Sequence, residues 1–297
     1  MSPSPGLEAD RMRRGIAMTA LAALLFGVNG AVAAELLEVV PATNTAQIRS
    51  VLAALLLGGL AYRMRATAHG GRLPGLAALG VILATVTVSF FMAINRLGVG
   101  PGVTIQFTGP VLVLAWMRLV GKRPVPRLAW FAAAGALLGV GLISKAWEWQ
   151  QLDLVGLGSA LLASITFAGY LILSGHLGRF LPTVTVTAYG FAFSALALLV
   201  VVPVRLPPGD PVVLVELVWL ITLGTVAPFL LEVGALGRVD AGTVGVVATL
   251  EPVIAAAVAW IWLDQLLDFW QVLGSLIVVT AVAVVQRFTG GKPTPIA

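Results

Sequence analysis

The sequence predicts an all-α membrane protein in which ten transmembrane helices form two inverted five-helix repeats. Three observations lead to this prediction: scarce charge, ten apolar segments of spanning length, and a correspondence between the two halves of the chain. Only 10% of the 297 residues are charged, whereas 59% are hydrophobic. A soluble domain carries about 25% charged residues because its surface faces water. This chain is therefore expected in a lipid bilayer.

Ten apolar segments are separated by glycine, proline and charged residues. A membrane-spanning helix needs about 20 apolar residues, and each segment comes close to that length. The segments are 15–34, 42–62, 74–95, 102–120, 127–144, 155–175, 183–204, 215–236, 241–262 and 268–287. Runs such as 53–60 and 195–202 lack the polar–apolar alternation of a transmembrane strand, which favours helices. The short connections leave no room for a soluble catalytic domain.

The basic residues indicate which loops face the cytoplasm. With the N-terminus inside, fourteen of the eighteen Lys and Arg residues fall in inside segments, and the outside loops hold only Arg96, Lys145 and Arg205. Cytoplasmic loops are enriched in Lys and Arg, so we expect an inner-membrane protein with both termini cytoplasmic. The net charge of +5 then reflects topology and contact with anionic lipid, and no nucleic-acid partner is expected.

An alternative for the N-terminus is a cleaved secretory signal. Basic residues at 11–14 precede an apolar run and a small-residue stretch at 31–33, as in such signals. The run is longer than usual and is interrupted by Gly27, Asn29 and Gly30. Cleavage would also weaken the charge asymmetry, which favours a retained first helix.

The two halves of the chain correspond at an offset of 142 residues. Segment 91–96 lies over 233–238, which aligns Arg96 with Arg238, and Pro110 aligns with Pro252. Each half holds five predicted helices, an odd number, so the two halves must have opposite orientations. We therefore expect repeats at 15–144 and 155–288 with a substrate site between them near the bilayer midplane, as in alternating-access carriers.

Two glutamates lie inside the predicted helices and away from the helix ends. Ionisable groups are costly inside a membrane and therefore mark candidate functional sites. A buried carboxyl group favours its neutral form, so Glu232 and Glu251 are candidates for proton coupling or substrate binding. The alternatives are a structural ion pair with Arg49 or Arg238, or a buried protonated acid without a role in transport.

Arg49 is the third ionisable residue inside a predicted helix and a candidate ion-pair partner. It lies nearer the outer end of its helix. Its long side chain could therefore reach water or pair with Glu35 or Glu38.

Polar residues on apolar helices add further candidates. Thr222, Thr225, Pro228 and Glu232 fall within one arc of an ideal helix. Such a polar stripe is expected to face a wet cavity, which makes Thr225 a candidate substrate ligand.

Prolines inside the predicted helices are candidate helix breaks or gates. A proline leaves the carbonyl four residues earlier without its usual donor, and the three such positions are Pro110, Pro228 and Pro252. Gln106 shares a helical face with Pro110 and adds an amide, so it is a candidate substrate ligand. The alternative is a kink that serves packing alone.

Asn29 and Tyr170 occupy nearly corresponding positions in the first helices of the two halves. A buried amide or phenol needs a hydrogen-bond partner, which could be a substrate or a neighbouring helix. Trp260 could also line a cavity, although tryptophan is common at membrane interfaces.

Four motifs carry a resemblance to a known family: QFTGP at 106–110, YLILSG at 170–175, PFLLE at 228–232 and LEP at 250–252. With them the chain resembles the EamA branch of the drug/metabolite transporter superfamily over roughly residues 15–288, and within it the threonine/homoserine exporter group. The resemblance implies two five-helix repeats and export of small amino acids or related metabolites. The chain departs from the pattern in two places, since that group has glutamate at Gln106 and the branch usually has Gly-Glu at Asp264-Gln265.

These observations predict a secondary transporter, coupled to protons and working by alternating access, and not an enzyme. The chain has no cysteine, which excludes thiolate metal sites and thiol nucleophiles, and we expect no metal or cofactor. The expected partners are a small-molecule substrate, protons and membrane lipid, with a monomer expected and a dimer as the alternative. A broad drug or aromatic-metabolite exporter and a membrane channel are the competing functions.

Overall fold

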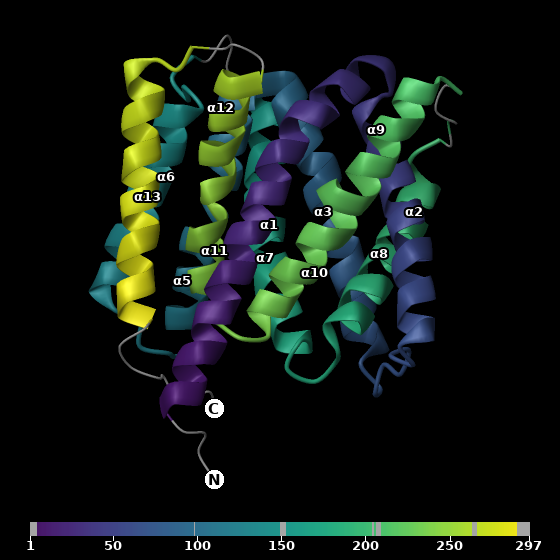
Figure 1. The fold of residues 1–297 in the computed structure, drawn as a ribbon, viewed down its shortest axis with the longest axis horizontal. Helices are drawn as coiled ribbons and strands as arrows, with labels where there is room; N and C mark the ends of the chain where they lie inside the picture. Colours follow the sequence, from purple (N-terminus) through teal and green to yellow (C-terminus); the bar gives the residue numbers. More distant parts are fainter. Residues whose placement is uncertain are drawn as a thin grey trace.

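The computed structural model describes residues 5–97, 99–148, 153–203, 205, 209–262 and 266–289, and this part of the chain is helical and contains no strand. Figure 1 shows the helices side by side in one bundle. The elements are α1 (Pro5–Val39), α2 (Ala42–Arg63), α3 (Leu73–Leu97), α4 (Val99–Gln106), α5 (Gly109–Leu119), α6 (Arg127–Ile143), α7 (Leu154–Leu177), α8 (Thr183–Val201), α9 (Pro211–Ile221), η1 (Thr222–Val226), α10 (Ala227–Leu236), α11 (Ala241–Ala248), α12 (Leu250–Trp262) and α13 (Phe269–Thr289).

In the part of the chain that the structure describes, seven helical segments are long and apolar enough to cross a bilayer, which makes the chain a multi-pass membrane protein. They are Thr43–Arg63, Leu73–Leu97, Pro101–Leu119, Leu154–Leu177, Thr183–Val201, Pro211–Leu236 and Ala241–Val258. Two shorter apolar segments, Arg127–Ile143 and Phe269–Val285, accompany them. Most helix bounds lie within a few residues of those predicted.

The first helix begins at Pro5, ten residues before the predicted start. The prediction followed apolar residues alone, whereas the first turns of α1 are polar. An ion pair between Arg14 and Asp10 on successive turns, at 2.8 Å, supports this extension. As Figure 1 shows, α1 begins at the same end of the bundle at which α13 ends.

Three of the predicted helices are interrupted near their middle. Residues 107–108 separate α4 from α5, Thr249 separates α11 from α12, and η1 is a π-helical turn between α9 and α10. A proline lies in the first turn of the helix after each interruption, where its missing N–H has no helical carbonyl to bond. These prolines are Pro110, Pro228 and Pro252.

The interruptions correct two expectations about shared helix faces. A π-turn holds more residues than an α-turn, so the ideal spacing fails across η1: Thr225 is fully buried, while Thr222 is exposed. Gln106 and Pro110 also lie on different helices, because α4 ends at Gln106. The polar stripe therefore contains Thr225 and Glu232 but not Thr222.

Small residues allow the backbones of neighbouring helices to approach closely. A Cβ atom on Gly139 of α6 would lie 2.7 Å from the carbonyl oxygen of Gly274 on α13. Side chains at these positions would force the two helices apart. The pairs α6 with α13, α3 with α7, and α2 with α8 are in extensive contact, whereas α1 packs against α10, α11 and α12.

Candidate functional site

The centre of the candidate site is a hydrogen bond between two helices. The Tyr170 hydroxyl on α7 donates to Oε2 of Glu232 on α10 at 2.9 Å. Both side chains are buried, with exposed fractions of 2% for Tyr170 and 4% for Glu232. The sequence named both residues as candidates but did not predict that they pair. A buried carboxyl group with a phenolic donor can hold or release a proton while remaining hydrogen-bonded.

Aromatic rings surround this hydrogen bond. Phe167 stacks on Tyr170 with 6.4 Å between ring centroids, and Phe229 meets Tyr170 edge to face at 5.7 Å. Phe26 of α1 and Phe191 of α8 contact Phe229 from two further helices, at 5.3 Å and 4.9 Å. The carboxyl group of Glu232 therefore lies among rings contributed by several helices.

One turn of α1 connects three elements of the second half of the chain. Phe26 contacts Phe229 of α10, and a Cβ on Gly27 would lie 2.9 Å from the carbonyl oxygen of Glu251 on α12. The Asn29 amide packs directly against Gly224 of η1. Residues 26–29 therefore hold α10, α12 and η1 around a common centre.

Glu251 is the second carboxyl group of this centre. It lies in the first turn of α12, directly before Pro252, and is partly buried. The turn of α1 described above contacts both helices, because Gly27 packs on the backbone of Glu251 and Phe26 contacts Phe229, three residues before Glu232.

Two candidate amides have buried oxygens that lack a hydrogen-bond donor within the described structure. They are Oδ1 of Asn29, on the turn of α1 described above, and Oε1 of Gln106, at the end of α4. Buried polar atoms are normally hydrogen-bonded. Each oxygen therefore lacks the hydrogen-bond donor that a buried amide normally has.

Two other predicted residues have different surroundings. The Thr225 hydroxyl donates to the Leu220 carbonyl at 2.8 Å, so it satisfies the backbone next to the π-turn. Trp260 is 51% exposed, about 14 Å further along α12 than Glu251 for a rise of 1.5 Å per residue. Neither residue is joined to the Tyr170–Glu232 pair by a described contact.

Arg49 donates to the Thr87 hydroxyl of α3 at 3.1 Å, and its Nε atom has no partner in the described structure. The side chains of Glu35 and Glu38, its suggested partners, lie outside the described residues. Arg238, just after α10, donates to the carbonyl of Gly234 in that helix at 2.6 Å. The carboxyl group of Glu232 thus bonds to a phenol rather than to either suggested arginine.

Sequence reasoning missed a second polar contact between helices. The hydroxyls of Thr108, in the break between α4 and α5, and Ser164, on α7, lie 2.6 Å apart. Thr108 lies within the QFTGP motif, but only the amide and proline of that motif were considered. Hydroxyl groups beside a predicted helix break are the signal that could have identified this contact, because a broken helix exposes polar backbone.

Contacts in the two halves of the chain match at nearly the same offset. A Cβ on Gly27 would meet the backbone of Glu251, and a Cβ on Gly109 would meet Phe167 at 2.8 Å and the backbone nitrogen of Ala168 at 3.6 Å. Gly27 precedes Ala168 by 141 residues, and Gly109 precedes Glu251 by 142. The contact of α1 with α12 is therefore matched by that of α7 with α5.

Comparison with known proteins identifies relatives along almost the whole chain. A model of the EamA-like transporter family matches residues 13–145 and 154–287. The threonine/homoserine exporter RhtA of Escherichia coli K12 is 30% identical over 266 residues, which cover 87% of this chain and 85% of that protein. The pseudopaline exporter CntI of Pseudomonas aeruginosa UCBPP-PA14 is 23% identical over 287 residues, covering 95% and 99%.

A solved crystal structure has the same fold as this chain. It superposes with a TM-score of 0.79 over 92% of this chain and 97% of its own, at 15% sequence identity. The family match covers most of the sequence, and the relatives are named as exporters. The chain therefore belongs to the EamA-like transporter family and is a transmembrane transporter rather than an enzyme.

Proposed function

We propose that this protein exports small amino acids or related metabolites across the inner membrane, coupled to protons. The observation that carries the proposal is the buried Tyr170–Glu232 hydrogen bond, on a helix that contacts the same turn of α1 as the helix of Glu251. Carboxyl groups in such a site can exchange protons during a transport cycle.

The proposed architecture consists of ten transmembrane helices in two inverted five-helix repeats, 15–144 and 155–288. The matched contacts of α1 with α12 and of α7 with α5 support a repeat relation between the two halves. With five spans in each repeat, an odd number, the two repeats would have opposite orientations in the membrane. The distribution of Lys and Arg supports cytoplasmic termini. The broken helices α4–α5 and α11–α12 would flank the substrate site, with Pro110, Pro228 and Pro252 at or near the moving segments.

An amino-acid substrate suits the acceptors of the site. The unpaired oxygens of Asn29 and Gln106 and the carboxyl group of Glu251 can accept hydrogen bonds from a substrate ammonium group. The relatives named as threonine/homoserine exporters favour a small polar amino acid. Protonation of Glu232 and Glu251 from the outside would remove the negative charge that attracts the ammonium group, and so promote release there.

A broader aromatic-metabolite exporter is a second candidate, favoured by the rings of Phe26, Phe167 and Phe229 around Glu232. Such rings contact apolar or aromatic groups well.

Radiolabel counterflow in proteoliposomes tests both candidates. We expect saturable exchange of labelled threonine that excess unlabelled threonine or homoserine abolishes. Competition by aromatic compounds alone would support the second candidate. Flux that neither saturates nor shows counterflow would indicate a channel and refute the proposed mechanism.

A further inference from the structure

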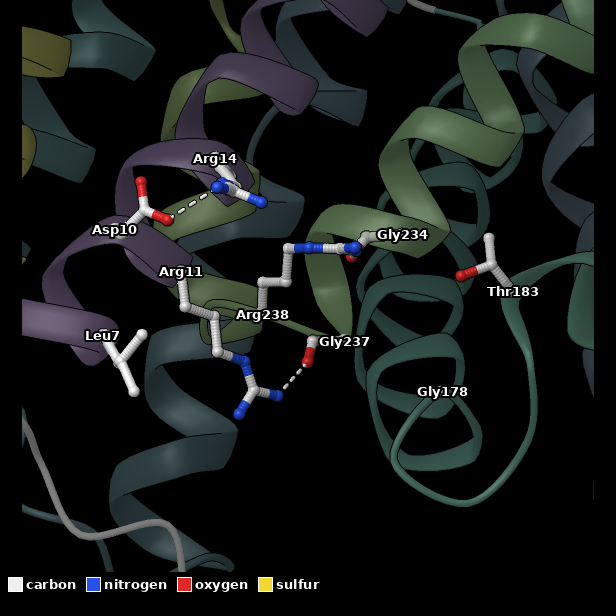
Figure 2. Close-up of a pocket in the computed structure, with 9 residues that line it drawn as sticks. All are labelled: Leu7, Asp10, Arg11, Arg14, Gly178, Thr183, Gly234, Gly237 and Arg238. Carbon is white, nitrogen blue, oxygen red and sulfur yellow. Dashed lines mark hydrogen bonds and ion pairs between the residues drawn. The ribbon is translucent and has the colours of Figure 1, made fainter. Parts of the chain in front are cut away.

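A polar cavity of about 380 Å³ lies at the end of the bundle where α1 begins. Figure 2 shows that its walls come from three regions: the start of α1, the turn between α7 and α8, and the end of α10 with the residues that follow it. The lining residues are Leu7, Asp10, Arg11, Arg14, Gly178, Thr183, Gly234, Gly237 and Arg238. It is separate from the Tyr170–Glu232 site.

Arginines dominate the charge of this cavity. Three guanidinium groups and one carboxylate line it, so its walls carry a net charge of about +2. Asp10 pairs with Arg14 at 2.8 Å, whereas Arg11 and Arg238 donate to the backbone carbonyls of Gly237 and Gly234, each at 2.6 Å. These carbonyl bonds hold Arg11 and Arg238 in place and leave other N–H groups of each guanidinium free to bind an anion.

At the opposite end of the bundle, Arg96 packs on a glycine as Arg238 does here, but its charge is paired with a carboxylate. Gly156 of α7 packs on Arg96, and Gly15 of α1 packs on Arg238, with the added Cβ atoms 2.9 Å and 3.2 Å from those of the arginines. Arg96 donates to the Asp153 carboxylate at 2.7 Å. This comparison rests on the repeat relation proposed above.

Asp153 corresponds to Met12 at the offset that relates Gly156 to Gly15, and Met12 has no charge. Within the described residues, Arg238 therefore lacks the acidic partner that Arg96 has. At the other end of the molecule the Asp153 carboxylate binds Arg96, whereas the corresponding Arg238 faces this cavity without a carboxylate partner among the described residues.

We infer that this cavity binds a phosphate-bearing anion, held by Arg11 and Arg238 and assisted by Arg14 and the Thr183 hydroxyl. Arginine forks match phosphate oxygens in pairs and are favoured wherever phosphate is recognised. Gly178, Gly234 and Gly237 have no side chain to obstruct close approach. The anion connects α1 to α10 and to the turn before α8, and so stabilises the packing of these three regions.

The phosphate can belong to a lipid headgroup or to a soluble ion. Leu7, at the edge of the cavity, is 65% exposed and would contact the acyl chains of a bound lipid. A lipid is therefore expected to bind more tightly than inorganic phosphate.

Thermal unfolding of the full-length protein in detergent tests the inference with three probes: phosphatidylglycerol, phosphatidylcholine and inorganic phosphate. We expect phosphatidylglycerol to raise the Tm of the wild type. For R11Q/R238Q, we expect the phosphatidylglycerol concentration that gives half of the maximal Tm shift to be at least tenfold higher. R63Q/R65Q is the matched control, because it removes the same charge from exposed sites at the end of α2. The control is expected to respond as the wild type does.

A second variant guards against misfolding. Arg14→Gln removes a mostly exposed side chain that bonds only within its own helix, and it is expected to weaken binding severalfold. A Tm shift with inorganic phosphate that also needs Arg11 and Arg238 would support the site with a soluble ion as its ligand. Equal responses of R11Q/R238Q and R63Q/R65Q, or equal shifts with phosphatidylcholine and phosphatidylglycerol, would overturn the inference. This experiment measures no transport, so a negative result would not contradict the proposed export function. In the same way, a negative transport result would not contradict anion binding in this cavity.

Discussion

Replacing Tyr170 with phenylalanine isolates the hydrogen bond at the centre of the site. Tyr170→Phe removes only the hydroxyl that donates to Glu232 at 2.9 Å, and it keeps the ring contacts with Phe167 and Phe229. Because both partners are buried, the carboxyl group loses a donor that water cannot easily replace. Leaving a buried acceptor unsatisfied costs about 1–3 kcal/mol. We expect the free energy of unfolding to fall by that amount.

Equilibrium unfolding in mixed micelles, with increasing SDS, measures this difference. Tyr189→Phe is the matched control, since its hydroxyl donates to the Thr67 carbonyl at 3.0 Å at an exposed position. There water can replace the lost donor, so we expect a loss of about 0.5 kcal/mol or less. Equal losses in the two variants would refute the argument that burial makes the Tyr170–Glu232 bond important.

Two further predictions concern packing and pH. Gly139→Ala is expected to lower the free energy of unfolding by about 1–3 kcal/mol, because its Cβ would overlap the Gly274 carbonyl; Gly158→Ala, in open space, should leave it nearly unchanged in the same SDS titration. The hydrogen bond from Lys145 holds the pKa of Asp268 below its ordinary value of about 3.9. The Lys145–Asp268 pair therefore stabilises the fold at pH values above that ordinary pKa. This stabilisation is lost as the pH falls through the lowered pKa of Asp268. Asp268→Asn should therefore lower Tm at neutral pH and have progressively less effect in acid, and a Tm difference that stays constant with pH would contradict this assignment.

The helix positions could be predicted because a bilayer imposes a length and an apolar composition on each span. The interruptions were harder to place. Prolines marked the helices that break, but at the π-turn Thr222–Val226 Gly224 packs against Asn29, a contact between distant parts of the chain that the local sequence does not reveal. The polar start of α1 was missed because an apolar pattern does not mark it.

The candidate site was predictable as a set of residues but not as an arrangement. Glu232 and Tyr170 were identified because polar groups are costly in a membrane. Their pairing was not predicted, since 62 residues separate them and charge alone favoured an arginine partner. Ring contacts such as that between Phe26 and Phe229 involve residue types that are ordinary in apolar helices, so the sequence gives no signal for them.

Glu232 and Glu251 are proposed to couple transport to protons. This proposal is tested most directly by threonine transport in proteoliposomes under an imposed pH gradient, compared with counterflow in the same preparation. We expect Glu232→Gln and Glu251→Gln to abolish gradient-driven accumulation while counterflow, which needs no net proton movement, persists. Glu148→Gln, in an exposed loop, should retain both activities. Full gradient-driven accumulation in both Glu232→Gln and Glu251→Gln would contradict the account.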